Sequence, residues 1–125
     1  MKIRILDDSI RLRLSQSDVA LADERGVVEG RTRFPDGSAF TYALETVRQG
    51  KAGASYGNGR MLIRLPAAEV SGWANDDTAV SLESTINLPE GGSLRILVEK
   101  DFQCLTARGD EDQSDLFVNP EASEC

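Results

Sequence analysis

Residues 10–14, Ile-Arg-Leu-Arg-Leu, recur 51 positions later as residues 61–65, Met-Leu-Ile-Arg-Leu. In both stretches apolar side chains stand at every second position, which is typical of a strand that buries one face. A second likeness joins residues 34–45 to residues 88–99, 54 positions further on. Self-similarity at a spacing of about 50 residues indicates an internal duplication, so we predict one architecture built from two similar halves.

Each half predicts two strands, a short helix and two further strands. In the first half, Ser15 or Ser17 can cap the helix and Gly26 can end it in a left-handed conformation. In the second half, the pair Asn58–Gly59 favours a tight hairpin turn between strands. The phase of the apolar alternation agrees between the halves. We therefore predict a mainly β (α+β) fold, a small barrel made of two ββαββ repeats with pseudo-two-fold symmetry.

Each half is close to the size at which a chain buries too little surface to be stable alone. We therefore expect one shared core, with Leu12 and Ile63 buried at equivalent positions and Trp73 buried on the apolar side of the second helix. The expected organisation is a single domain over residues 1–125, with repeat 1 at 1–47, a linker at 48–52, repeat 2 at 53–101 and an acidic C-terminal segment at 102–125.

The net charge of −7 is distributed unevenly along the chain. Residues 1–47 and residues 48–101 each have a net charge of −1. Residues 102–125, in contrast, hold one basic and six acidic residues. A nearly neutral body with an acidic tail does not exclude a nucleic acid partner, so charge alone leaves that class of function open.

The expected location is the cytoplasm, without contact to a membrane. No apolar run approaches the roughly 18 residues that can cross a bilayer, and the start of the chain lacks a signal-peptide pattern. Two cysteines, Cys104 and Cys125, fit free thiols in a reducing compartment better than a disulfide or half of a metal site.

The stretch 58–70, Asn-Gly-Arg-Met-Leu-Ile-Arg-Leu-Pro-Ala-Ala-Glu-Val, resembles the AbrB-type swapped-hairpin domain in its turn, its Gly-Arg pair, its apolar strand and its proline at the helix start. The acidic stretch 75–80 stands where that family has a Gly-Asp motif, although the glycine is missing, and Ser15 replaces the proline in the first half. The resemblance implies a barrel of two interleaved units. Other small barrels, including the double-psi type, stay open as alternatives. The whole chain also resembles a group of short bacterial proteins of unassigned function.

Basic residues on the hairpins contact DNA in AbrB-like proteins, and other relatives of that class bind a protein partner. Carried over residue by residue, the resemblance implies these nucleic-acid-binding candidates: Arg4, Arg11, Arg13, Arg60 and Arg64. Each alternates with apolar residues, so its side chain is expected on the outer face of its strand. The other interpretation is the ordinary polar face of a half-buried strand, with each arginine beside a nearby acid.

The chain contains no histidine. This excludes Ser-His-Asp and Cys-His catalysis as well as histidine metal sites. The sequence also lacks a Walker loop, a GxGxxG motif after a strand and a CxxC pair. Paired carboxylates at residues 7–8 and 76–77 fall in predicted turns, where a solvated charge is the ordinary interpretation. We therefore predict no enzyme activity and no cofactor.

The acidic tail offers a candidate metal site. Asp110, Asp112, Ser114 and Glu121 stand at positions 1, 3, 5 and 12 of a calcium-binding loop. Position 6 lacks the usual glycine, however, and a proline directly precedes the last ligand. A solvated acidic segment is the other interpretation. The apolar stretch 116–118, Leu-Phe-Val, indicates that the segment docks onto the barrel.

The function predicted from these observations is a non-catalytic binding or regulatory module with a protein or DNA partner, present as a monomer or weak dimer. The alternative is a protein that binds a small ligand or a divalent metal through its acidic C-terminal segment. We also expect residues 110–124 to lie near Arg11, Arg13 or Arg64 and to neutralise that face in part, because opposite charges attract.

Overall fold

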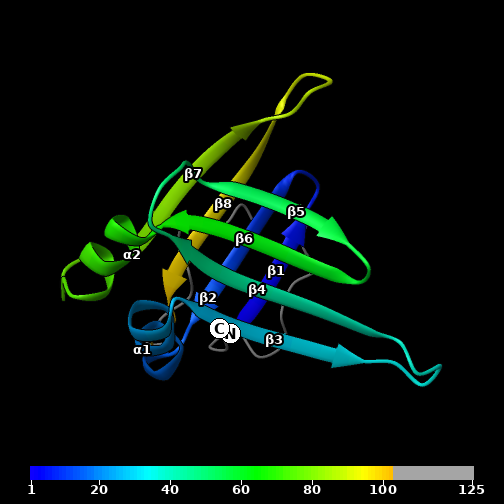
Figure 1. The fold of residues 1–125 in the computed structure, drawn as a ribbon, viewed down its shortest axis with the longest axis horizontal. Helices are drawn as coiled ribbons and strands as arrows, with labels where there is room; N and C mark the ends of the chain where they lie inside the picture. Colours follow the sequence, from blue (N-terminus) through cyan, green and yellow to red (C-terminus); the bar gives the residue numbers. More distant parts are fainter. Residues whose placement is uncertain (103–125) are drawn as a thin grey trace, which may run out of the picture.

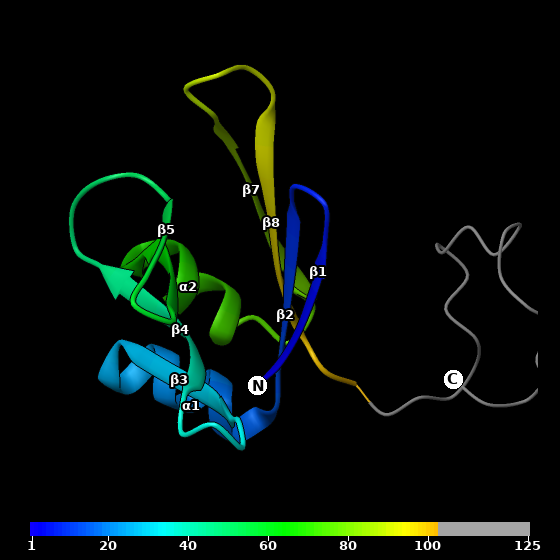
Figure 2. The same ribbon diagram turned by 90° about the vertical axis from the view of Figure 1, so that its right-hand side faces the viewer.

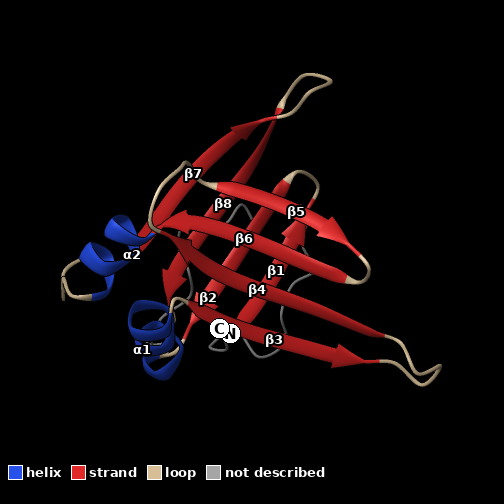
Figure 3. Ribbon diagram, viewed as in Figure 1, coloured by secondary structure: helices blue, strands red, loops and turns tan. Residues whose placement is uncertain are grey.

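The computed structural model describes residues 1–102, which form eight strands and two helices. The strands are β1 (Lys2–Leu6), β2 (Ser9–Leu14), β3 (Val27–Arg33), β4 (Ala39–Val47), β5 (Gly53–Gly57), β6 (Arg60–Pro66), β7 (Ser81–Asn87) and β8 (Ser93–Lys100). The helices are α1 (Gln16–Arg25) and α2 (Ala67–Ala74). Figure 3 shows a mainly β molecule with both helices together at one end, so the predicted mainly β character and the predicted order of strands and helices are confirmed.

The strands make two four-stranded sheets. Sheet A has the order β1-β2-β8-β7 and sheet B has the order β3-β4-β6-β5 (Figure 1). Strand β2 runs parallel to β8, and β4 runs parallel to β6, whereas the four hairpins are antiparallel. Each sheet therefore combines one hairpin from residues 1–47 with one hairpin from residues 53–100.

The prediction of a closed barrel is wrong. Within residues 1–102, β1 and β7 are the edges of sheet A, β3 and β5 are the edges of sheet B, and no strand of one sheet pairs with a strand of the other. The strands of the two sheets run in crossed directions, and the sheets lie as separate layers in the view of Figure 2. A closed barrel would require the edge strands of the two sheets to pair with each other. These strands diverge instead, so each has a hydrogen-bonded neighbour on one side only.

In the parallel pairing between the hairpins, the residues of one pair are separated from those of the other by the two spacings found in the sequence. Leu12 of β2 pairs with Val98 of β8, and Ile63 of β6 pairs with Leu44 of β4. Leu12 and Ile63 are 51 positions apart, and Leu44 and Val98 are 54 apart, which are the two spacings of the sequence repeats. All four side chains are fully buried, as predicted for Leu12 and Ile63.

The local signals for helix ends and turns are also found in the structure. Ser15 caps α1 and forms a reciprocal capping box with Asp18. Gly26 ends α1 with a φ of 77°, which a residue with a Cβ rarely adopts. Asn58 and Gly59 have φ values of 51° and 71°, as a type I′ hairpin turn requires.

The core lies between the sheets and beneath the helices, and it draws on both halves. Its buried members are Leu12, Leu14, Ala22, Val28, Leu44, Met61, Ile63, Leu65, Val70, Trp73, Ile96 and Val98. Trp73 is only 3% exposed, which confirms its predicted burial, and its Nε1 donates a hydrogen bond to the carbonyl of Val80 at 3.0 Å. Val80 itself precedes β7 and is half exposed.

Candidate functional site

An apolar groove opens between the two sheets at the strand ends that lie farthest from the helices. Its volume is about 460 Å³. The groove is lined by Ile5, Ile10, Phe40, Ala54, Ser55, Tyr56, Met61 and Leu94. Both sheets contribute to it, because β1, β2 and β8 belong to sheet A, and β4, β5 and β6 belong to sheet B. The core thus continues into a solvent-accessible apolar surface.

The mouth of the groove carries large exposed side chains. Tyr56 is 70% exposed and Ile5 is 56% exposed. The Phe40 ring is stacked on Tyr42, with 5.9 Å between the centroids, and it lies 6.4 Å from the Tyr56 ring. Aromatic rings of this kind provide a large apolar contact area with little conformational freedom to lose. The groove is therefore suited to bind an apolar ligand segment.

Sequence reasoning missed this groove. Ile5 and Ile10 continue the apolar alternation that also includes the buried Leu12, so the pattern predicts the same burial for all three. Only the position of Ile5 and Ile10 at the strand ends distinguishes them. Whether a strand end is covered depends on how the two sheets diverge, and the alternation carries no information about that.

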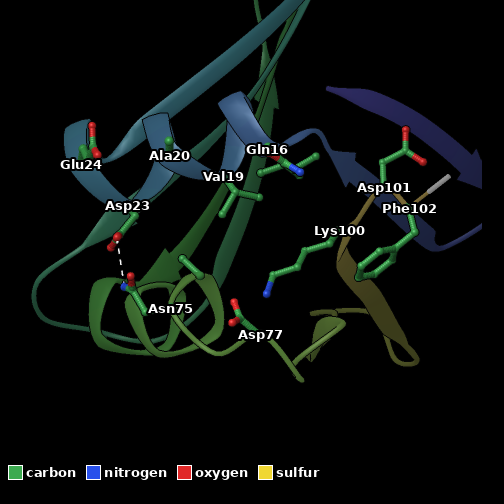
Figure 4. Close-up of a pocket in the computed structure, with 12 residues that line it drawn as sticks. Gln16, Val19, Ala20, Asp23, Glu24, Asn75, Asp77, Lys100, Asp101 and Phe102 are labelled. Atoms are coloured by element: carbon green, nitrogen blue, oxygen red, sulfur yellow. Dashed lines mark hydrogen bonds between the residues drawn. The ribbon is translucent and has the colours of Figure 1, made fainter.

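A polar cleft of about 530 Å³ lies at the opposite end of the molecule, between α1, α2 and the end of β8 (Figure 4). Across it, Asn75 Nδ2 donates a hydrogen bond to Asp23 Oδ2 at 3.1 Å. Lys100 points into the cleft, where its Nζ donates to the carbonyl of Asp76 at 2.9 Å and lies 5.5 Å from the centroid of the Trp73 ring.

Two polar side chains that line this cleft, Asn75 and Lys100, make the hydrogen bonds described above, and Asp76, which accepts from Lys100, is itself hydrogen-bonded to Thr78. Hydrogen bonds from Thr78, first from its hydroxyl and then from its amide, hold the pKa of Asp76 below its usual value. Residues 1–102 contain no cluster of three or more histidine, cysteine, aspartate or glutamate side chains that could hold a metal ion. The arrangement joins α1, α2 and β8, and we assign it a structural role.

Three of the predicted basic candidates lie on the outer face of sheet A. Arg4 and Arg11 face each other across β1 and β2, and Arg13 lies two residues further along β2, opposite Lys2. Arg13 Nε donates to Glu99 Oε1 at 2.7 Å, and Arg11 Nε lies 3.7 Å from the same oxygen. The carboxylate of Glu99 on β8 thus interacts with two arginines of β2.

The other two candidates lie on the outer face of sheet B. Arg60 forms an ion pair with Glu29 at 2.8 Å. The guanidinium of Arg64 lies over Gly53, its cross-strand neighbour on β5. The structure therefore divides the five arginines between two outer faces and does not bring them together into one basic surface.

The predicted metal ligands, Asp110, Asp112, Ser114 and Glu121, lie outside the described residues, and so do both cysteines. The calcium site, the docking of residues 116–118 and the thiol state of Cys104 and Cys125 stay predictions.

Comparison with known sequences also covers residues that follow Phe102. Residues 1–121 match the sequence pattern of DUF7009, a family of unknown function. The chain belongs to the DUF7009 family. In this DUF7009 protein the match includes the Leu-Phe-Val stretch at 116–118 as well as both sheets. No curated protein and no solved structure matches it. In the part of the DUF7009 protein that the structure describes, neither helix has the length and apolar character needed to cross a membrane.

Proposed function

We propose that this protein is a non-catalytic binding module that holds an apolar segment of a protein ligand in the groove between its sheets. The observation that carries the proposal is the groove itself, with Ile5 and Tyr56 more than half exposed at its mouth. A ligand that covers these side chains removes apolar surface from water, which is the main favourable term in association.

The charges beside the groove favour a ligand with an acidic flank. Arg4 and Arg11 directly neighbour the groove residues Ile5 and Ile10 in the chain and lie on the outer face of sheet A. That face carries more basic than acidic side chains: Lys2, Arg4, Arg11, Arg13 and Arg95 against Glu83, Glu99 and Asp101, which forms an ion pair with Lys2. An acidic segment next to the apolar one would be attracted to this face.

The exchange of hairpins between the halves supports the resemblance to AbrB-type swapped-hairpin domains. It also supports a pseudo-two-fold relation of the two repeats, because equivalent residues pair in both sheets. Proteins of that class bind DNA or protein partners. We favour a protein partner, because the candidate arginines lie on two separate faces and Glu99 and Glu29 already engage three of them. A cytoplasmic location stays part of the proposal.

Binding can be tested by fluorescence anisotropy with the full-length protein. The ligands are a labelled peptide with an acidic run before a short apolar run, a peptide with a basic run before the same apolar run, and a labelled DNA duplex. We expect the acidic peptide to bind most tightly and Tyr56→Lys to weaken it at least tenfold. Val80→Lys is the matched control, because Val80 is also half exposed but lies outside the groove. Tighter binding of DNA, or equal effects of the two variants, would contradict the proposal.

A further inference from the structure

We infer that the chain's own C-terminal segment occupies the groove, with Leu116, Phe117 and Val118 covering Ile5 and Tyr56. This inference rests on the proposed function, because it names the resident ligand of the same groove. The groove is then a regulated site, which a partner can enter only by displacing the segment.

The segment is long enough to reach the groove. Phe102 lies at the polar cleft, at the helix end of the molecule, whereas the groove lies at the far ends of the strands. Strand β8 has eight residues, so the two ends are about 26 Å apart along the sheet. Leu116 follows Phe102 by 14 residues, which span up to about 46 Å when extended. The excess length allows the chain to pass around the edge strand β1.

The order of charged and apolar residues in the segment matches the order of partners on sheet A. From the helix end of β2 toward the groove, the chain presents Arg13, then Arg11 and then the groove residue Ile10. From Phe102 onward, the segment presents the acidic stretch 110–115 before the apolar stretch 116–118. A segment that runs toward the groove therefore places its acids on the basic face of sheet A when its apolar residues arrive at the groove.

The family match covers this segment as well. The match to DUF7009 continues to residue 121, so it includes the acidic and apolar stretches of the segment as part of the family's unit. The stretch 116–118 is also the only run of three large apolar residues after Phe102. In water this stretch would expose apolar surface, as the groove itself does.

The direct test is NMR on the isotope-labelled full-length protein. We expect nuclear Overhauser contacts between the Phe117 ring and the methyl groups of Ile5, Ile10 or Met61. A sample mixed from differently labelled chains shows whether such contacts arise within one chain or between two. Contacts within one chain support the inference. Contacts only between chains, which would make a second copy the occupant, or no contacts at all, overturn it.

A competition measurement separates this inference from the proposed function. Phe117→Asp should free the groove and tighten binding of the acidic–apolar peptide at least tenfold, whereas the matched control Leu105→Asp should leave it unchanged. If wild type and Phe117→Asp bind the peptide equally, the inference is overturned and the proposed function stands. If no form binds the peptide although the intrachain contacts are present, the proposed function fails and the inference stands.

Discussion

The ammonium nitrogen of Lys100 lies 5.5 Å from the centroid of the buried Trp73 ring. Lys100 is the last residue of β8 and Trp73 lies in α2, so this contact joins sheet A to the second helix. Trp73 also donates its Nε1 hydrogen to Val80, and Lys100 donates to the carbonyl of Asp76. The single tryptophan is therefore held by apolar packing, a hydrogen bond and a cation at once.

Truncation of this side chain should be costly. We expect Trp73→Ala to lower the free energy of unfolding by about 3–5 kcal/mol, because it leaves a cavity in the core. Trp73→Phe should cost less, since it keeps much of the apolar contact and loses mainly the hydrogen bond to Val80, about 1 kcal/mol. Urea denaturation followed by circular dichroism measures both values. A loss below about 1 kcal/mol for Trp73→Ala would show that the ring is not part of the core.

The Lys100 contact can be tested separately. Lys100→Met keeps an unbranched apolar stem but removes the ammonium, so the cation–π contact, about 0.5–1 kcal/mol, and the hydrogen bond to Asp76 are both lost. We expect a small drop in stability together with a change in the fluorescence of Trp73. Lys51→Met, an exposed position in the linker, is the control and should change neither. Equal fluorescence changes in both variants would refute the contact.

Gly30 should not tolerate a side chain. A Cβ at Gly30 would overlap the ring of its cross-strand partner Tyr42. The Tyr42 hydroxyl in turn donates to the carbonyl of Met1 at 2.7 Å. Gly30→Ala must therefore displace this ring, and we expect a loss of about 1–3 kcal/mol. Gly72→Ala is the matched control: nothing lies within 4 Å of its added methyl, and alanine favours the helix by about 1 kcal/mol. Thermal melts of both variants should therefore shift in opposite directions.

Glu99 should restrain the basic character of sheet A. Glu99→Gln removes the charge shared by Arg11 and Arg13, so we expect stronger retention on heparin and a stability loss of about 1 kcal/mol. Glu90→Gln changes the net charge equally but lies in an exposed turn between β7 and β8. Salt elution should separate the two variants, with Glu99→Gln eluting later. Co-elution would mean that only net charge matters.

Stability should fall in acid because three aspartates have lowered pKa values. Partial burial acts to raise the pKa of Asp18, but hydrogen bonds from the terminal amine and from Ser15 outweigh it. The hydroxyl and amide of Ser38 lower the pKa of Asp36, and Thr78 does the same for Asp76. A folded pKa below the usual 3.8 means that the unfolded chain takes up protons first, so this stability is present above 3.8 and lost as the pH falls below it.

Melting temperatures between about pH 7 and pH 2.5 measure this effect. Asp76→Asn should lower the melting temperature at neutral pH. It should also reduce the further fall in melting temperature that occurs below the usual aspartate pKa. Asp77→Asn removes a neighbouring charge and is the control. A melting temperature that stays constant through this acid range in the wild type would contradict the argument.

Much of the fold follows from short stretches of sequence. The inward side chains at Leu12 and Ile63, the cap at Ser15 and the turn at Asn58–Gly59 each depend on residues a few positions apart. Strand alternation, helix capping and turn dihedral angles are local properties, so the amino-acid pattern alone can predict them. The outward direction of the candidate arginines was predictable for the same reason.

Only the tertiary structure decided which strands pair across the halves and what those pairs place side by side. Arg13 meets Glu99 across 86 positions of sequence, and Leu12 meets Val98 across the same separation. Two open sheets in place of a closed barrel, and the groove between their diverging ends, result from how the exchanged hairpins cross over one core. Such long-range pairing forms because the packing energy of the whole chain exceeds the entropy cost of closing large loops. No short stretch of sequence determines that balance.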